Sequence, residues 1–368
     1  MSKLTLFDSY LNNDGPVALV IREHMVPVEG PDGVLFPATF AAGDGFPGGY
    51  NIDSLDQVPG TRNVCLIDSV GSQANRIEPI FMEERYLALV PQVVIQADLK
   101  NNEVRQVNLL KAGHRAGDAI VRCSELQPLL QAAFTSILKG DAEPLAKIAP
   151  TSLVFGVWDS RDTQAKLPRL IASTIRAHDV RKLRRSAQYI PAMEYVADEL
   201  LDEATDKATK DSYAERGFVH VPATGSHGGV IAEGGIRREA TLGLAAIRQL
   251  HAGEGEAKTL ALRRYILGLA LTAFTHNPSG DLRQGCLLVL DPEKSREFVA
   301  VHPDGRREPI TITHDQALAY ATAAAEAFGV GPSRTVAFDK ERAAKDIRGE
   351  GDAKPKKKKN AGGSEKKS

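Results

Sequence analysis

The stretch CLIDSVGSQANRIE, residues 65–78, carries the clearest local signal in this chain and predicts an α-helix. Asp68 and Ser69 are residue types that cap the first turn of a helix. Apolar residues then recur at helical spacing and predict one buried face: Val70, Ala74, Ile77 and Phe81. The rest of the chain can be read outward from this capped helix.

The polar face of the same predicted helix is a candidate phosphate site. Ser72 and Gln73 fall in its first turn, where free backbone N–H groups attract anions. Arg76 follows Ser72 by four residues and therefore shares its face. An ordinary capped helix with a solvated polar face would show the same pattern, so both interpretations stay open.

Segments on both sides predict a mixture of strands and helices. We predict strands at residues 16–28, 92–98, 104–110, 152–158, 182–190, 286–290, 298–301 and 335–338, with 286–290 paired to 298–301. We predict helices at residues 126–138, 166–177, 241–250, 258–274 and 312–328. The Gly/Pro-rich stretch 30–60 indicates a long loop or insertion, and the five glycines of 218–238 favour a hairpin. Because strands and helices do not alternate strictly, the order favours an α+β fold with an antiparallel sheet.

Composition excludes several classes of protein. The chain has 368 residues, of which 42% are hydrophobic and 25% charged, as in folded soluble proteins. Neither a long uncharged apolar window nor the core of a signal peptide is evident, so we expect a cytoplasmic protein without a membrane span. The cysteines, Cys65, Cys123 and Cys286, are too widely spaced for a CxxC motif, and we expect them to be buried and free.

Charge is spread unevenly along the chain. Residues 354–368 hold seven lysines and one glutamate, a net +6, whereas the whole chain carries −1. Residues 1–353 therefore carry −7, and any nucleic-acid surface on them must be local. The Lys-rich composition from residue 348 onward predicts a disordered tail.

One internal segment is locally basic. Residues 159–185 contain eight Lys or Arg and three Asp. On the predicted helix 166–177, Arg169, Ser173 and Arg176 would form a single stripe that could follow phosphates. Trp158, the only tryptophan, precedes this segment and could stack on a base. A solvated charged helix and a core tryptophan would account for these residues equally well.

Catalytic motifs are missing from the sequence. The glycine-rich stretch 224–242, which contains His227 and ends its polar part with Arg237 and Arg238, has neither phosphate-loop nor dinucleotide spacing. HExxH, GxSxG and clustered metal ligands are also absent. We therefore expect no catalytic residues, no metal and no cofactor.

Several segments taken together resemble the RAMP-superfamily backbone subunit of type I CRISPR Cascade complexes, subtype I-U/I-G. The segments are CLIDSVGSQANRIE from Cys65, VFGVWDSR from Val154, LPRLIASTIRAHDV from Leu167, GGIRREATL from Gly234 and HNPSGDLRQGCLLV from His276. The resemblance implies an α+β fold over residues 1–347, with an RRM-like (ferredoxin-like) antiparallel palm. It also implies finger insertions, one at about 30–60, and a thumb at about 207–238.

The resemblance implies a function as well. Copies of the subunit would polymerise along a CRISPR RNA and present its spacer to target DNA, together with other Cascade subunits and a recruited helicase-nuclease. The chain itself would not be an enzyme. Expected RNA-binding residues are Ser72, Gln73, Asn75, Arg76, Trp158, Ser160, Arg161, Arg169, Ser173, Arg176, His227, Arg237 and Arg238. The alternative is a metal-dependent RAMP endoribonuclease that uses Asp159 or His178 in acid–base or metal chemistry.

Overall fold

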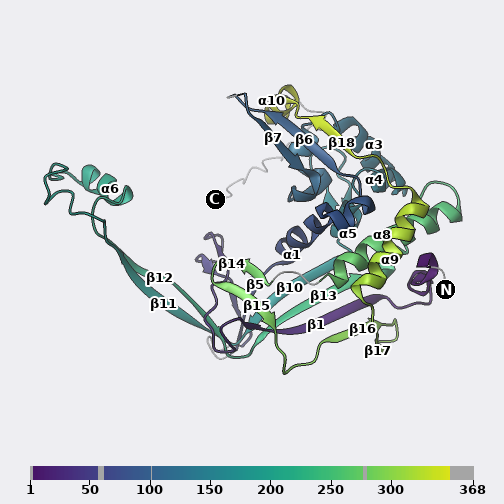
Figure 1. Ribbon diagram of the computed structural model, residues 1–368, viewed down its shortest axis with the longest axis horizontal. Coiled ribbons are helices and arrows are strands. Elements are labelled where there is room, and N and C mark those ends of the chain that lie inside the picture. Colours follow the sequence, from purple (N-terminus) through teal and green to yellow (C-terminus); the bar gives the residue numbers. More distant parts are fainter. Residues whose placement is uncertain (1–2, 57–61, 101, 277–279, 349–368) are drawn as a thin grey trace, which may run out of the picture.

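The structure is a computed structural model that describes residues 3–56, 62–100, 102–276 and 280–348 (Figure 1). Its largest element is a nine-stranded antiparallel sheet, with the path β14-β15-β1-β13-β10-β5-β4 and with β16 and β17 added beside β1. The strands are β1 (Ala18–Pro27), β4 (Ile52–Ser54), β5 (Asn63–Asp68), β10 (Ile171–His178), β13 (Ile236–Gly243), β14 (Asp281–Arg283), β15 (Cys286–Leu290), β16 (Glu297–Val301) and β17 (Arg307–Pro309). Together with the helices, this sheet confirms the predicted α+β class.

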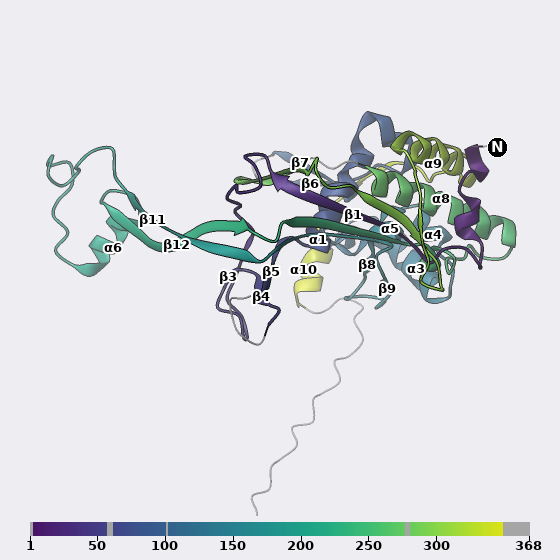
Figure 2. The same ribbon diagram turned by 90° about the horizontal axis from the view of Figure 1, so that it is seen from below.

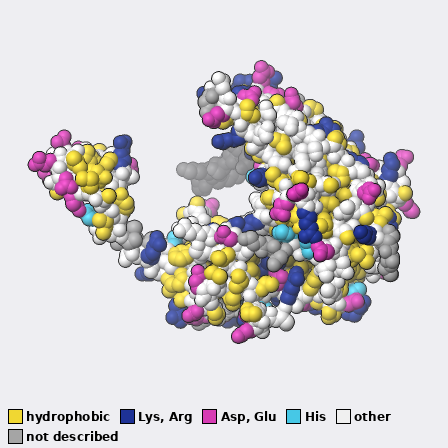
Figure 3. Space-filling model, viewed as in Figure 1, with side chains coloured by type: hydrophobic (Ala, Val, Ile, Leu, Met, Phe, Trp, Pro, Cys, Tyr) yellow, Lys and Arg dark blue, Asp and Glu magenta, His cyan; other side chains and the backbone are white. Residues whose placement is uncertain are grey.

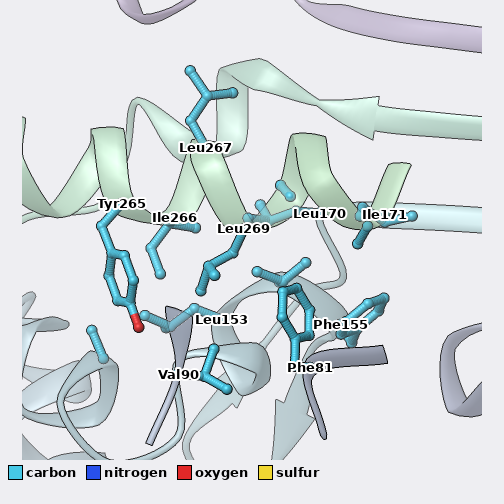
Figure 4. Packing of buried hydrophobic residues seen from close by; sticks show 14 of the residues in the cluster. Phe81, Val90, Leu153, Phe155, Leu170, Ile171, Tyr265, Ile266, Leu267 and Leu269 are labelled. Carbon is cyan, nitrogen blue, oxygen red and sulfur yellow. The ribbon is translucent and has the colours of Figure 1, made fainter. Parts of the chain in front are cut away.

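Helices lie over the central strands and enclose the main core (Figure 1). They are α1 (Val70–Ile77), α5 (Thr151–Phe155), α7 (Leu244–Ile247), α8 (Glu256–Thr275) and α9 (His314–Phe328). Side chains of α8 point toward Leu153, Phe155 and Phe81 (Figure 4). Tyr265 of α8 is fully buried and donates its hydroxyl proton to the carbonyl of Leu89 at 2.8 Å, so its polar atom is satisfied.

The central strands and two helices follow a simple order along the chain: β1, α1, β10, β13, α8, β16. In the sheet the four strands lie in the order β16-β1-β13-β10. On β1, Leu19, Ile21 and Met25 alternate with outward residues and face the two hydrophobic cores. The strand β5 continues the sheet beyond β10 and leads directly into α1.

A long two-stranded arm, residues 180–232, extends from the sheet between β10 and β13. Its strands β11 (Val180–Tyr189) and β12 (Val221–Ala232) pair antiparallel, and α6 (Lys207–Glu215) lies at its far end. Figure 2 shows this arm as a narrow ribbon that projects well beyond the body. Residues 218–238 therefore do not form the predicted hairpin, because β12 pairs with β11 and β13 belongs to the main sheet.

A second lobe lies on the other side of the helices in Figure 1. Its three-stranded sheet has the order β18-β6-β7, with β18 parallel to β6. The elements are β6 (Val93–Asp98), β7 (Val104–Asn108), α2 (Ala119–Arg122), α3 (Gln127–Leu138), α4 (Glu143–Ala146), β18 (Arg334–Ala337) and α10 (Lys340–Arg348). These confirm the strands predicted at 92–98, 104–110 and 335–338 and the helix at 126–138.

Two predicted elements have the wrong type. Residues 166–177 form β9 (Lys166–Leu167) and most of β10 instead of a helix, because alternate side chains of β10 pack into the core while its backbone pairs with β13 and β5. Residues 152–158 form most of α5, followed by β8 (Val157–Trp158), instead of a strand. Residues 152–158 are a short apolar run, whose period alone does not separate helix from strand, and residues 166–177 carry charges at helical spacing that favoured the helix.

Smaller differences concern the edges of the sheet. Strands β15 and β16 each pair with β1, at opposite ends, and not with one another as predicted. The predicted helix 241–250 begins as the end of β13 and contains only the short α7. Within 30–60, the described residues include β2 (Thr39–Phe40), β3 (Gly49–Tyr50) and β4. The predicted disordered tail from residue 349 on lies outside the described residues.

Two further expectations can be compared with the structure. Cys65, Cys123 and Cys286 are free and buried, as predicted. Over the part of the chain that the structure describes, none of the helices combines the length and the apolar character that a bilayer crossing requires. Short 3-10 helices complete the fold at Lys3–Thr5, Asp8–Leu11, Glu78–Met82, Glu84–Leu89, Leu109–Lys111 and Arg115–Gly117.

Candidate nucleic-acid interface

A basic hollow of about 600 Å³ opens beside α1. Its wall is built by residues 113–122 and 156–169, which β8 and β9 hold together. The residues that give the hollow its character are Arg115, Arg122, Trp158, Arg161, Lys166 and Arg169. Trp158 is 55% exposed, and the Lys166 ammonium lies 5.3 Å from the centroid of its ring. An exposed ring among cations is a suitable surface for a nucleotide base.

Local geometry explains why these side chains meet. The β8–β9 ladder pairs Trp158 with Lys166 and brings the two side chains together. Asp159 closes the connecting loop, because its carboxylate accepts hydrogen bonds from Thr163 N at 2.7 Å and from Thr163 Oγ1 at 2.6 Å. Arg161 lies in this loop. Gly156 has φ +78°, a conformation that favours glycine, and a Cβ there would approach Arg169 Cγ to 2.9 Å.

The hollow holds more positive charge than its carboxylates neutralise. Arg115 pairs with Glu78 at 2.6 Å and Arg122 with Asp346 at 2.6 Å. None of the ion pairs among the described residues involves the remaining three cations of the wall, Arg161, Lys166 and Arg169. Burial lowers the pKa of Arg115, and the positive charge of Arg169 acts in the same direction. An anion in the hollow would relieve this repulsion.

Beneath the hollow, the Glu78–Arg115 pair fixes one wall. Both side chains are nearly inaccessible to solvent. Burial raises the pKa of Glu78 to about 7, while the Arg115 charge opposes that shift. Arg115 Nη2 also donates to Asn75 Oδ1 at 3.3 Å, so α1 is tied to the hollow.

The beginning of α1 lies at the edge of the hollow. The Ser69 hydroxyl caps the helix by accepting from Ser72 N at 3.2 Å. A Cβ built on Gly71 would lie 3.9 Å from Arg169 Nη2. The Arg169 guanidinium therefore lies beside the first turn of α1. Of the predicted RNA-binding residues, four line the hollow: Trp158, Ser160, Arg161 and Arg169. Asn75 is joined to its wall through Arg115.

On the other side of α1, two arginines share one buried carboxylate. Asp68 is fully enclosed and accepts from Arg76 Nε at 3.2 Å and from Arg283 Nη2 at 3.0 Å. Ser72 Oγ donates to the same carboxylate at 2.8 Å. The side chains of Arg76 and Arg283 keep 35% and 25% of their surface exposed. Two guanidiniums with one carboxylate leave a net +1 beside α1. Arg283 is not among the residues predicted to bind RNA, although it lies in the segment from His276 that carries the family resemblance.

A chain of hydrogen bonds continues from Asp68 through the interior. Gln73 Nε2 donates to Asp68 at 2.7 Å, and Ser173 Oγ donates to Gln73 Oε1 at 2.9 Å. Arg238 Nε donates to Ser173 Oγ at 3.2 Å, and Arg238 pairs with Glu23 at 2.5 Å. Gln73, Ser173 and Arg238 are all at most 3% exposed. These three predicted RNA-binding residues thus lie inside the protein, with their polar groups already engaged.

The predicted stripe of Arg169, Ser173 and Arg176 does not exist. Arg169 precedes β10, and on the strand Ser173 and Arg176 point to opposite faces of the sheet. Arg176 is cross-strand neighbour to Arg237 on the face away from Ser173, and it lies 3.9 Å from Glu239. His227 lies at the base of the arm, where its ring is 4.8 Å from that of Tyr50. Arg176, Arg237 and His227 are therefore not part of the hollow.

The residues of the endoribonuclease alternative are not assembled into a site. Asp159 is 4% exposed, and its carboxylate accepts the hydrogen bonds that close its own loop. His178 ends β10, roughly 23 Å along the strand from Ile171, which follows the hollow segment. Within the described residues, no group of three or more His, Cys, Asp or Glu side chains could hold a metal ion.

One comparison with known proteins finds a similarity over part of the chain. Residues 19–182 match a family model of CRISPR-associated proteins, so this part of the chain is similar to that family. The particular family is described as CRISPR-associated protein GSU0053. The matched residues run from β1 into the arm and include α1 and every residue that lines the hollow. No curated protein matches the chain.

Proposed function

We propose that this protein is the CRISPR RNA-binding backbone subunit of a type I Cascade complex of the U/G subtype. It acts in the cytoplasm, binds the guide RNA without reading its sequence, and presents the spacer to target DNA. Its further partners are other copies of itself, other Cascade subunits and a recruited helicase-nuclease. The family match supports the CRISPR context, and the hollow beside α1 supports the binding of RNA.

The observation that carries the proposal is the combination of unpaired cations with an exposed ring. Arg161, Lys166 and Arg169 supply charge for phosphates, and Trp158 supplies a flat surface for one base. Such contacts are made with backbone and with any base, as a guide with variable spacers requires. We propose that the strand continues over Gly71 and Asn75 toward Arg76 and Arg283.

The arrangement of the central strands supports an RRM-like palm. A strand-helix-strand-strand-helix-strand order, with the last strand beside the first, is the ferredoxin-like pattern. In this interpretation the arm, residues 180–232, is the thumb. It therefore begins earlier and ends earlier than the range 207–238 that the sequence suggested.

The acidic and apolar surface at the tip of the arm supports self-association. Residues 190–220 contain eight acidic and three basic side chains, a net −5. Ile190, Met193 and Leu200 are 49–65% exposed, and Figure 3 shows yellow and magenta side chains gathered there. Lys and Arg side chains appear along the concave edge of the body in the same view. A contact between unlike surfaces of identical copies produces an open filament.

Intrinsic fluorescence provides a direct test, because Trp158 is the only tryptophan. Titration with single-stranded RNA should quench its emission as a base stacks on the ring. Trp158→Ala should weaken binding by about 1–3 kcal/mol, whereas Trp158→Phe should retain most of the affinity. Two RNAs of unrelated sequence should bind equally well. RNA that binds by anisotropy while the Trp158 emission stays unchanged would place the strand elsewhere.

We also propose that the chain is not the nuclease of its complex. RNA incubated with the purified protein and Mg²⁺ should stay intact over the time in which binding is complete. Periodic cleavage that Asp159→Ala abolishes would favour the endoribonuclease instead. Asp159→Asn in parallel separates loss of the carboxylate charge from loss of the loop contact to Thr163.

A further inference from the structure

The ion pair in the wall of the hollow is buried with several of its polar atoms unsatisfied. Glu78 and Arg115 are 1% and 2% exposed, and Glu78 Oε2 lies 2.6 Å from Arg115 Nε. Among the described residues, Glu78 Oε1 and Arg115 Nε have no hydrogen-bond partner, and the buried Thr151 hydroxyl that faces Glu78 has none either. Buried polar groups are nearly always hydrogen-bonded. The pair is therefore held mainly by its opposite charges.

Arg115 is the member of the pair that lines the hollow. Its Nη1 donates to the Gly156 carbonyl at 3.4 Å and its Nη2 to Asn75 Oδ1 at 3.3 Å, both long for hydrogen bonds from a charged donor. Only 3% of the Arg115 side chain is exposed. The guanidinium would therefore act on a phosphate in the hollow chiefly through its charge, from within the wall.

The protonation state of Glu78 sets the net charge of this wall. Burial raises the pKa of its carboxyl to about 7, while the charge of Arg115 and the hydroxyl of Thr151 oppose that rise. As a carboxylate, Glu78 cancels the charge of Arg115. As a neutral acid, it leaves the guanidinium positive. A phosphate in the hollow disfavours the carboxylate and so raises the pKa of Glu78 further.

We propose that Glu78 takes up a proton from solvent when an RNA phosphate enters the hollow, and that Arg115 thereby becomes a further cation for that phosphate. This inference rests on the proposed function. Affinity for RNA should be highest below the pKa of Glu78 in the free protein, about 7, and should fall as pH rises through the higher pKa of the complex. Above both values Glu78 is a carboxylate with and without RNA, so the dependence ends there.

A second titratable group lines the hollow and has to be separated from Glu78. The His114 side chain is 86% exposed and lies 3.5 Å from Asp118. A protonated imidazole would also attract a phosphate, and it would give a pH dependence of the same sign. His114→Gln keeps a polar side chain but cannot titrate, so it provides the background for the test.

The test follows the binding of a single-stranded oligoadenylate, whose bases stay uncharged near neutral pH, by anisotropy at constant salt. From about pH 9 to about pH 6, the affinity of the His114→Gln protein should rise by about tenfold, since a rise of one in a pKa corresponds to tenfold in affinity. With Glu78→Gln added, the profile should be flat and close to the acidic value. Calorimetry of the His114→Gln protein at about pH 7.5, in two buffers of different ionisation enthalpy, should show uptake of about half a proton per site.

The outcomes separate this proposal from the proposed function. A pH profile that persists when Glu78→Gln is added would refute the role of Glu78 and leave the proposed function standing. A profile that His114→Gln alone abolishes would assign the proton to His114 and overturn the proposal as well. Should Glu78→Gln fail to fold, calorimetry decides, because binding by the His114→Gln protein without proton uptake contradicts the proposal. A wild-type protein that ignores RNA at every pH would refute the proposed function itself.

Discussion

Replacement of Arg161 and Arg169 by alanine should lower the affinity for single-stranded RNA by about a hundredfold or more. Each guanidinium can donate charge-assisted hydrogen bonds worth about 1.5–3 kcal/mol, and tenfold in affinity corresponds to about 1.4 kcal/mol. Neither side chain takes part in an ion pair among the described residues, so their removal leaves no carboxylate uncompensated. The loss should be similar for all spacer sequences, and the salt slope should fall by about one unit or more.

A matched control is available on the opposite edge of the sheet. Arg306 and Arg307 lie at the β16–β17 turn, are 57% and 43% exposed, and pair with Glu308 and Glu297. Their double replacement by alanine changes the net charge by the same amount. It should leave RNA affinity within about threefold of the wild type, since exposed pairs contribute little. Equal losses in both double variants would mean that net charge, and not the hollow, determines binding.

Replacement of Asp68 by asparagine should destabilise the protein by about 3–5 kcal/mol, the usual cost of removing one partner from a buried ion pair. Asp68 is fully enclosed and, among the residues that the structure describes, is the only carboxylate paired with Arg76 or Arg283. Asparagine keeps the shape but presents an NH₂ group to donors such as Gln73 Nε2. Urea denaturation measures the change, as a lower midpoint with an unchanged m-value.

Asp304 supplies the comparison for this second prediction. Its side chain is 68% exposed and lies 3.9 Å from Arg306. Asp304→Asn should alter the free energy of unfolding by less than about 0.5 kcal/mol. A change below about 1 kcal/mol for Asp68→Asn would show that the cluster around Asp68 does not depend on the carboxylate charge. In that case the packing of its apolar face alone would hold α1 in place.

Local sequence patterns were sufficient to predict elements whose stabilising contacts lie within a few residues of one another. The Ser69 cap and the apolar spacing of Ala74 and Ile77 predicted α1, and the structure confirms both. By contrast, residues 166–177 carry a two-residue period in Ile171, Ser173 and Ile175 together with charges at helical spacing. Pairing with β13, which lies far along the chain, decides in favour of the strand.

In the candidate site too, residues close together in the sequence could be predicted, whereas ion pairs between distant residues could not. Trp158, Ser160, Arg161 and Arg169 lie in one short segment, and the structure places them around one hollow. Whether an arginine is free or engaged depends on partners that are distant in sequence. Arg238 meets Glu23 across 215 positions, and Arg283 meets Asp68 across the same separation. No local pattern in the sequence signals such partners.

The way the arm joins the sheet has a consequence for how this protein can vary. Strand β10 passes into β11 at Asp179, and β12 returns to β13 through Gly234 and Gly235, so the arm is a continuation of two strands that are already neighbours. Adding or deleting opposed pairs of residues changes its length without altering the register of the sheet. The distance from the body to the tip of the arm can therefore change without any change in the hollow, and the arm serves as an adjustable spacer.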